Sequence, residues 1–135
     1  MTTTDAVLPT SEAFLGFWRE RHLCTVTTLR PDGTPHVVPM GVVVALGDRA
    51  WAITSASSRK VANLRAAGPA GGRIAVCCVD GRRWSTLEGL ATVADDPASV
   101  AEAERRYAER YRVPRENPAR VALRITVDRV LGNVR

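Results

Sequence analysis

The chain has 135 residues, a formal net charge of +5 at pH 7, and 45% hydrophobic residues. This length suits one domain, and the apolar content argues against intrinsic disorder. We expect a single domain over residues 1–135, with residues 1–9 as a flexible N-terminus. No apolar run reaches the roughly 18 residues of a membrane span. The first residues also lack a secretion-signal pattern, so we expect a cytoplasmic protein with no membrane partner.

Arginine supplies almost all of the positive charge, because Lys60 is the only lysine. Genomic base composition alone would explain this bias, whereas a functional interpretation is attraction of an anionic ligand. The sequence has no recognised nucleic-acid motif and no interleaved surface aromatics, so we expect no nucleic-acid partner.

The three cysteines are Cys24, Cys77 and Cys78. Their odd number argues against a disulfide framework, and their spacing lacks the CxxC pattern of many metal sites. We therefore expect no metal site, and we interpret the cysteines as buried small residues in a reducing compartment.

The first half of the chain predicts one helix and three strands. Thr10 or Ser11 is placed to cap a helix whose apolar stripe is Phe14, Leu15, Phe17 and Trp18. Strands are predicted over residues 23–29, 35–45 and 50–54, separated by turns at 31–34 and 46–49. Pro39 and Gly41 lie inside the second strand, which indicates an edge, a bulge or a close approach to the backbone.

The second half predicts a helix over residues 57–67, strands over 73–80 and 84–94, a helix over 97–111 and a last strand over 121–130. Meandering strands with few helices argue against a doubly wound parallel sheet. The predicted fold is therefore mainly β with flanking helices, as a six-stranded antiparallel barrel.

Residues 54–65 are the most informative segment, because a strand leads through small hydroxyl residues into a helix. Free N–H groups at a helix start favour an anion, and Ser58, Arg59 and Lys60 add donors and charge there. Cations in the first turn oppose the helix dipole, so a bound phosphate would relieve a local conflict. The alternative is an ordinary solvated helix start capped by a serine.

Two other segments carry weaker signals. His36 lies in a strand whose proline leaves backbone groups free for a planar ring, but a lone histidine after a turn is more often a surface residue. Trp84 follows arginines at a turn and could stack on a planar anion, or belong to an exposed hairpin. Signatures of esterases, metalloproteases, P-loop enzymes and Rossmann dinucleotide-binding proteins are absent.

Taken together, six segments resemble the flavin/deazaflavin oxidoreductases of the pyridoxamine-5′-phosphate-oxidase-like split barrels. The similarity spans residues 11–132, and the last two segments are similar to the actinobacterial F420-dependent biliverdin reductases in particular. The segments are residues 20–23, 27–39, 58–65, 83–89, 107–115 and 117–121.

The resemblance implies a homodimeric split β-barrel with two cofactor clefts at the interface. It implies that Lys60 holds the phosphate of coenzyme F420, that residues 36–40 line its ring, and that Trp84 reaches in from the other subunit. The residues expected at the cofactor are His36, Val37, Val38, Pro39, Met40, Ser55, Ser58, Arg59, Lys60, Asn63 and Trp84.

The implied reaction is hydride transfer from C5 of the reduced deazaflavin to biliverdin. Biliverdin is an anionic tetrapyrrole, and arginines would bind its two propionates. We expect no catalytic side chain, because solvent or the cofactor could supply the proton. The chain ends without the C-terminal substrate-phosphate arginines of pyridoxamine-phosphate oxidases proper, which argues against that activity. The alternatives are an FMN-dependent oxidoreductase and a non-catalytic binder of F420 or a tetrapyrrole.

Overall fold

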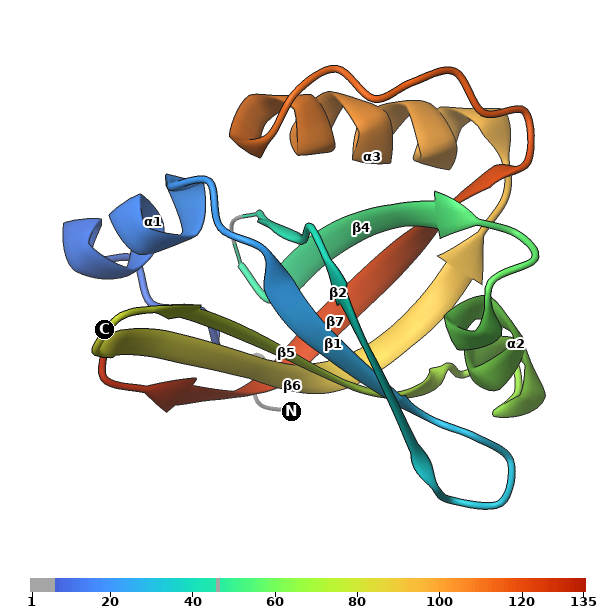
Figure 1. Ribbon diagram of the computed structural model, residues 1–135, viewed down its shortest axis with the longest axis horizontal. Coiled ribbons are helices and arrows are strands. Elements are labelled where there is room, and N and C mark those ends of the chain that lie inside the picture. Colours follow the sequence, from blue (N-terminus) through green and yellow to red (C-terminus); the bar gives the residue numbers. More distant parts are fainter. Residues whose placement is uncertain (1–6, 46) are drawn as a thin grey trace, which may run out of the picture.

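One curved antiparallel sheet organises the chain in the computed structural model, which describes residues 7–45 and 47–135. The three helices of the described residues lie around the sheet (Figure 1). The elements are α1 (Glu12–Arg19), β1 (Cys24–Leu29), β2 (Pro35–Met40), β3 (Val43–Val44), β4 (Arg49–Ser55), α2 (Arg59–Ala66), β5 (Gly72–Asp80), β6 (Arg83–Ala94), α3 (Pro97–Arg110) and β7 (Arg120–Gly132).

The strand order is β2-β1-β5-β6-β7-β4-β3, and every neighbouring pair is antiparallel. The two edge strands, β2 and β3, follow one another in the chain and are joined only through Gly41 and Val42. The sheet therefore curls until its edges meet through the covalent chain, without a hydrogen-bonded ladder between them. This arrangement fits the expected mainly β split barrel, although the barrel is not closed.

The prediction of six strands was wrong, because the single strand expected over residues 35–45 is interrupted and becomes β2 and β3. The interruption follows from contacts with the end of α3. A Cβ on Gly41 would lie 2.7 Å from Cε2 of Tyr111, so only glycine admits this ring. The N–H of Val42 donates to the Tyr111 hydroxyl (3.3 Å) and its carbonyl accepts from Arg110 (2.6 Å).

The helix predicted near the N-terminus is α1, and its apolar side chains pack into the core enclosed by the sheet. Ser11, one of the two predicted cap residues, caps α1 by accepting a hydrogen bond from the N–H of Phe14 (3.1 Å). The side chains of Phe14, Phe17 and Trp18 are buried in the core formed by the inward residues of the strands. Trp18 Nε1 donates to the buried hydroxyl of Ser85 (3.0 Å), so its polar atom is also satisfied.

The other two helices cover separate parts of the sheet (Figure 1). α2 packs on β1, β5 and β6, while α3 lies along β4 and β7 and begins with Pro97 after the cap Asp96, where the sequence placed its start. No helix among residues 7–45 and 47–135 is both long and apolar enough to cross a membrane.

Two expectations near the N-terminal half fall partly outside the described residues. These are the flexible N-terminus over 1–9, of which residues 1–6 are not described, and the turn over 46–49, of which residue 46 is not described. Leu8, within the first of these segments, is buried in the core, and its N–H donates to the carbonyl of Gly47 (3.3 Å).

The β6–β7 ladder has a bulge between Glu88 and Gly89. A Cβ on Gly89 would lie 2.0 Å from the backbone oxygen of Thr126, so Gly89→Ala must displace a strand. We expect Gly89→Ala to lower the free energy of unfolding by about 1–3 kcal/mol in denaturant titrations.

Gly16→Ala is the matched control, because the added methyl in α1 meets no atom within 4 Å. It should raise stability by about 0.5–1 kcal/mol through better helix propensity. Equal destabilisation by both substitutions would contradict the steric account of the bulge.

Candidate functional site

The start of α2 is a helix end with cations and without a side-chain cap. Ser58 is the N-cap residue, but its hydroxyl makes no bond to a helix N–H and instead accepts from Thr54 Oγ1 (3.3 Å). The first turn holds Arg59 and Lys60 and no acidic residue. Its N–H groups and two positive side chains are therefore available to an anion.

His36 on β2 lies close to these cations and to a third, Arg30. Burial lowers the pKa of the His36 imidazole, and the charges of Arg30, Lys60 and Arg59 lower it further. Burial also lowers the pKa of Lys60, which is half-buried. His36 Nδ1 is shielded from solvent and has no hydrogen-bond partner among the described residues. Repelling positive groups around an unsatisfied nitrogen make a place where an anion would be stabilised.

A groove of about 370 Å³ opens beside the start of α2, and we call it the arginine groove. Arg112 and Arg115 on its wall are exposed, whereas Arg120 is paired with Glu104 (2.8 Å). Thr54, which bonds Ser58, also lines the groove and connects it to the start of α2. Its lining residues are Leu23, Met40, Gly41, Ile53, Thr54, Ser55, Tyr107, Arg112, Pro114, Arg115, Asn117 and Arg120.

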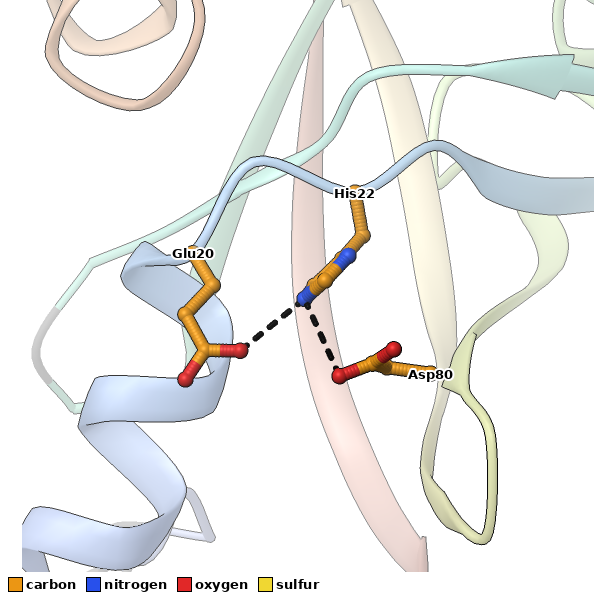
Figure 2. Close-up of side chains that lie close together, drawn as sticks. All are labelled: Glu20, His22 and Asp80. Carbon is orange, nitrogen blue, oxygen red and sulfur yellow. Dashed lines mark hydrogen bonds and ion pairs between the residues drawn. The ribbon is translucent and has the colours of Figure 1, made fainter.

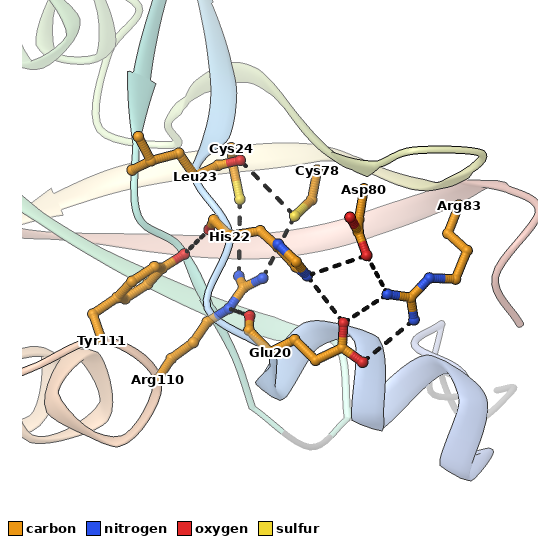
Figure 3. A network of polar contacts seen from close by, with 9 residues as sticks. All are labelled: Glu20, His22, Leu23, Cys24, Cys78, Asp80, Arg83, Arg110 and Tyr111. Carbon is orange, nitrogen blue, oxygen red and sulfur yellow. Dashed lines mark hydrogen bonds and ion pairs between the residues drawn. The ribbon is translucent and has the colours of Figure 1, made fainter.

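The end of α3 holds the wall of this groove in place. Arg110 Nε donates to the carbonyl of Glu20 (2.8 Å), and the Tyr111 hydroxyl donates to the carbonyl of His22 (2.7 Å; Figure 3). Together with their bonds to Val42, these contacts position Met40 and Gly41 in the groove. Sequence reasoning missed Arg110, because nothing in the pattern distinguishes it from the other arginines of its helix.

The structure brings only some of the predicted cofactor residues together. His36, Val38 and Met40 are half-buried and alternate along β2 with the exposed Val37 and Pro39, so the two sets face opposite sides of the sheet. Only backbone atoms of β2 could contact a ligand along both sets.

Ser55 and the amide nitrogen of Asn63 already have partners within the chain, whereas the buried Oδ1 of Asn63 has none among the described residues. Asn63 is 3% exposed and donates from Nδ2 to Thr28 Oγ1 (3.0 Å), so it connects α2 to β1 rather than facing solvent. Ser55 lies in the arginine groove and accepts from Asn117 Nδ2 (3.0 Å).

Trp84 lies far from the start of α2 in the same chain. It is at the beginning of β6, whereas Thr92 near the other end of that strand lies beside α2. Eight residues of strand separate the two positions by roughly 26 Å. Trp84 therefore does not meet Lys60 within one chain, and its reach into the cleft of another subunit stays a prediction.

A second polar cluster lies near the β5–β6 hairpin (Figure 2). His22 Nε2 is 3.0 Å from Glu20 Oε1 and 3.9 Å from Asp80 Oδ2. These residue types can hold a metal ion, but the guanidinium of Arg83 already contacts both carboxylates. Hydrogen bonds from Arg83 and then His22 lower the pKa of Glu20 to about 2. The cluster therefore ties the segment after α1 to the hairpin.

Comparisons with known proteins give a consistent result for nearly the whole chain. The family model described as pyridoxamine 5′-phosphate oxidase matches residues 10–133. A curated F420H2-dependent biliverdin reductase of Mycobacterium tuberculosis (strain CDC 1551 / Oshkosh) is 42% identical over 134 residues, covering 98% of this chain and 95% of the relative.

Solved structures show the same fold. A conserved hypothetical protein of Mycobacterium tuberculosis aligns with a TM-score of 0.76 at 27% identity, covering 99% of this chain and 89% of the other. A structure described as an F420 reductase aligns with a TM-score of 0.69 at 22% identity, covering 93% and 98%. The second likeness concerns the fold alone.

The Glu20 cluster predicts a pH effect on stability. Because the folded pKa of Glu20 lies near 2, below its ordinary 4.5, its ion pairs stabilise the fold above pH 4.5 and are lost as the pH falls toward 2. Glu20→Gln should therefore show a shallower loss of stability than the wild type between these pH values in denaturant titrations.

Glu116→Gln is the control, because this exposed carboxylate has no ion pair among the residues that the structure describes. It should follow the wild-type pH profile. A Glu20→Gln profile that runs parallel to the wild type would contradict the assignment.

Proposed function

Because the chain belongs to the pyridoxamine 5′-phosphate oxidase family, we propose that it is an F420H2-dependent reductase whose acceptor is biliverdin. The reduced deazaflavin, when bound, supplies a hydride from C5 of its ring. The observation that carries the proposal is the start of α2 beside the arginine groove, together with the similarity to a reductase of that name.

The residues at the start of α2 fit the phosphate of the cofactor. Two cations and the N–H groups of an uncapped helix turn share one place, and His36 Nδ1 has no partner there. A phosphate would satisfy these donors and offset the repulsion between Arg59, Lys60 and Arg30. Asn63, held by Thr28 behind the first turn, keeps α2 against β1 and acts as a positioning residue.

The arginine groove next to it suits the rest of the reaction. Its volume of about 370 Å³ is in the ordinary range for ligand sites. Met40 and Gly41 on one wall would contact the ring, and Ser55 is close to the connection with α2.

Biliverdin carries two propionates, and Arg112 and Arg115 are the exposed cations of the groove. Charge-assisted bonds from these two arginines to the propionates would hold the acceptor in a fixed orientation. Among the described lining residues there is no carboxylic acid or imidazole. We therefore assign the proton that completes the reduction to solvent, with the chain's residues orienting the acceptor.

A homodimer is part of the proposal, and one outer face of the sheet supports it. The registers of β1, β2, β5, β6 and β7 place their exposed apolar side chains on the same face. An apolar face of this kind is typical of an interface, and a second copy would cover it. Its large members are Leu29, Val37, Val79, Trp84, Leu90 and Leu131.

Two measurements, made one after the other, test the proposal. Titration of F420 into the purified protein should show binding, and biliverdin should then oxidise the reduced cofactor in the presence of enzyme. Tight binding without turnover would leave a non-catalytic binder. A yellow protein with no affinity for F420 would favour FMN, and a monomer at working concentration would remove the dimer from the proposal.

Lys60→Ala should weaken F420 binding by roughly 1–3 kcal/mol, because it removes a charge-assisted bond to phosphate. Arg65→Ala is the control, since Arg65 lies in the last turn of the same helix beside Asp95. F420 titrations of both variants give the comparison. Unchanged affinity in folded Lys60→Ala would show that the phosphate binds elsewhere.

The variant with Arg112→Ala and Arg115→Ala should raise the KM for biliverdin about tenfold or more, while the Kd for F420 stays near the wild-type value. Arg19→Ala, which removes an exposed cation on α1, should change neither constant. Steady-state kinetics and cofactor titration separate the two effects. A large change in the F420 Kd would instead assign these arginines to the anionic cofactor tail.

A further inference from the structure

Arg110 is a buried cation that has no acidic partner among the described residues. Arg110 is 5% exposed, and it takes part in none of the ion pairs in the described part of the chain. Its guanidinium lies 5.0 Å from the ring of Trp18 and 5.2 Å from that of Tyr111. A buried charge without a counter-ion is costly, so the remaining neighbours of Arg110 decide how its charge is balanced.

Besides the carbonyls of Glu20 and Val42, the polar neighbours of the Arg110 guanidinium are two sulfur atoms. Arg110 Nη1 lies 3.8 Å from Cys24 Sγ, and Nη2 lies 3.5 Å from Cys78 Sγ (Figure 3). Cys24 and Cys78 are direct cross-strand partners in the β1–β5 ladder, and both are buried. Directly opposed Cβ atoms lie about 4.5–5.5 Å apart, close to the roughly 3.5–4.5 Å of a disulfide.

The charges around the pair favour one thiolate. A hydrogen bond from Cys24 and the guanidinium of Arg110 lower the pKa of Cys78 to about 6, against the opposing effect of burial. The pKa of Cys24 is raised, first by Cys78 and then by burial. The other ionisable groups facing the pair are His22 and Tyr111. The pair thus favours ionisation of Cys78 over Cys24, which would place a negative charge beside Arg110.

We propose that Cys24 and Cys78 form a buried redox couple that a peroxide converts into a cross-strand disulfide. The Cys78 thiolate attacks one peroxide oxygen and becomes a sulfenic acid, with hydroxide leaving. The Cys24 sulfur then attacks the Cys78 sulfur, the S–S bond forms, and the sulfenic oxygen leaves as water. Both thiol protons end in water, so two thiols and one hydrogen peroxide give one disulfide and two waters.

The position of the pair gives a small oxidant a route. Cys24 and Cys78 are the last pair of the β1–β5 ladder, and their neighbours Leu23 and Val79 are 68% and 57% exposed. Ladder ends open locally at low cost in free energy. Oxidation would remove the negative charge beside Arg110. Because Arg110 also binds the carbonyl of Val42, oxidation would alter the β2–β3 crossing, the link through Gly41 and Val42 that joins the two edge strands. Neither cysteine takes part in the proposed reductase activity, so the couple is independent of it.

The test uses Cys77→Ser, because Cys77 is half-buried, points to the opposite face and would otherwise react by itself. The folded variant is treated with hydrogen peroxide, quenched, unfolded and alkylated. We expect the intact mass to fall by two hydrogen atoms, neither thiol to be alkylated, and a peptide linking Cys24 to Cys78. A thiol reductant should restore both thiols.

A variant with both Cys77→Ser and Cys24→Ser is the matched control and should never lose two hydrogen atoms. Should it fail to fold, the same treatment of Cys77→Ser in denaturant replaces it and should form the disulfide more slowly than in the folded protein. Two alkylatable thiols after treatment, a gain of oxygen on one cysteine alone, or linkage only in the unfolded chain would each overturn the proposal.

Discussion

A buried guanidinium at the end of α3 joins parts of the chain that are far apart in sequence. Arg110 binds the carbonyls of Glu20 and Val42 and lies against the sulfurs of Cys24 and Cys78. It thereby connects the segment after α1, the crossing between the two edge strands and the β1–β5 ladder. A sheet whose edges are not hydrogen-bonded to each other needs such a contact, because the free backbone groups at the crossing would otherwise be buried without partners.

The candidate site depends on Arg110 indirectly, through the link between β2 and β3. The crossing that Arg110 and Tyr111 hold places Met40 and Gly41 on the wall of the arginine groove, and β4 leads from the groove into the start of α2. Anion-binding groups and groove thus come from different elements, and the sheet keeps them adjacent. Trp84, on the apolar outer face, lies at the opposite end of β6 from the part of that strand beside α2, so only a Trp84 from a second subunit could enter the proposed cleft.

Most helices and strands could be predicted because their signals are local. The Ser11 cap, the start of α3 at Pro97 and the positive-φ glycine of the turn before β2 depend on neighbouring residues only. The interruption at Gly41 depends on Tyr111, seventy positions later, and no local pattern contains that contact. The same holds for Asn63, which is polar and near the helix start, yet is directed inward by Thr28.

The sequence by itself determined the order of the elements, the resemblance to split-barrel oxidoreductases, and the cations at the start of α2, because these follow from residue type and short spacing. Tertiary structure alone decided which side chains of β2 face the site, that Arg110 is buried while Arg112 is exposed, and that Cys24 faces Cys78. The physical reason is that burial and pairing are set by contacts between distant strands, whose register and curvature emerge only when the whole sheet packs.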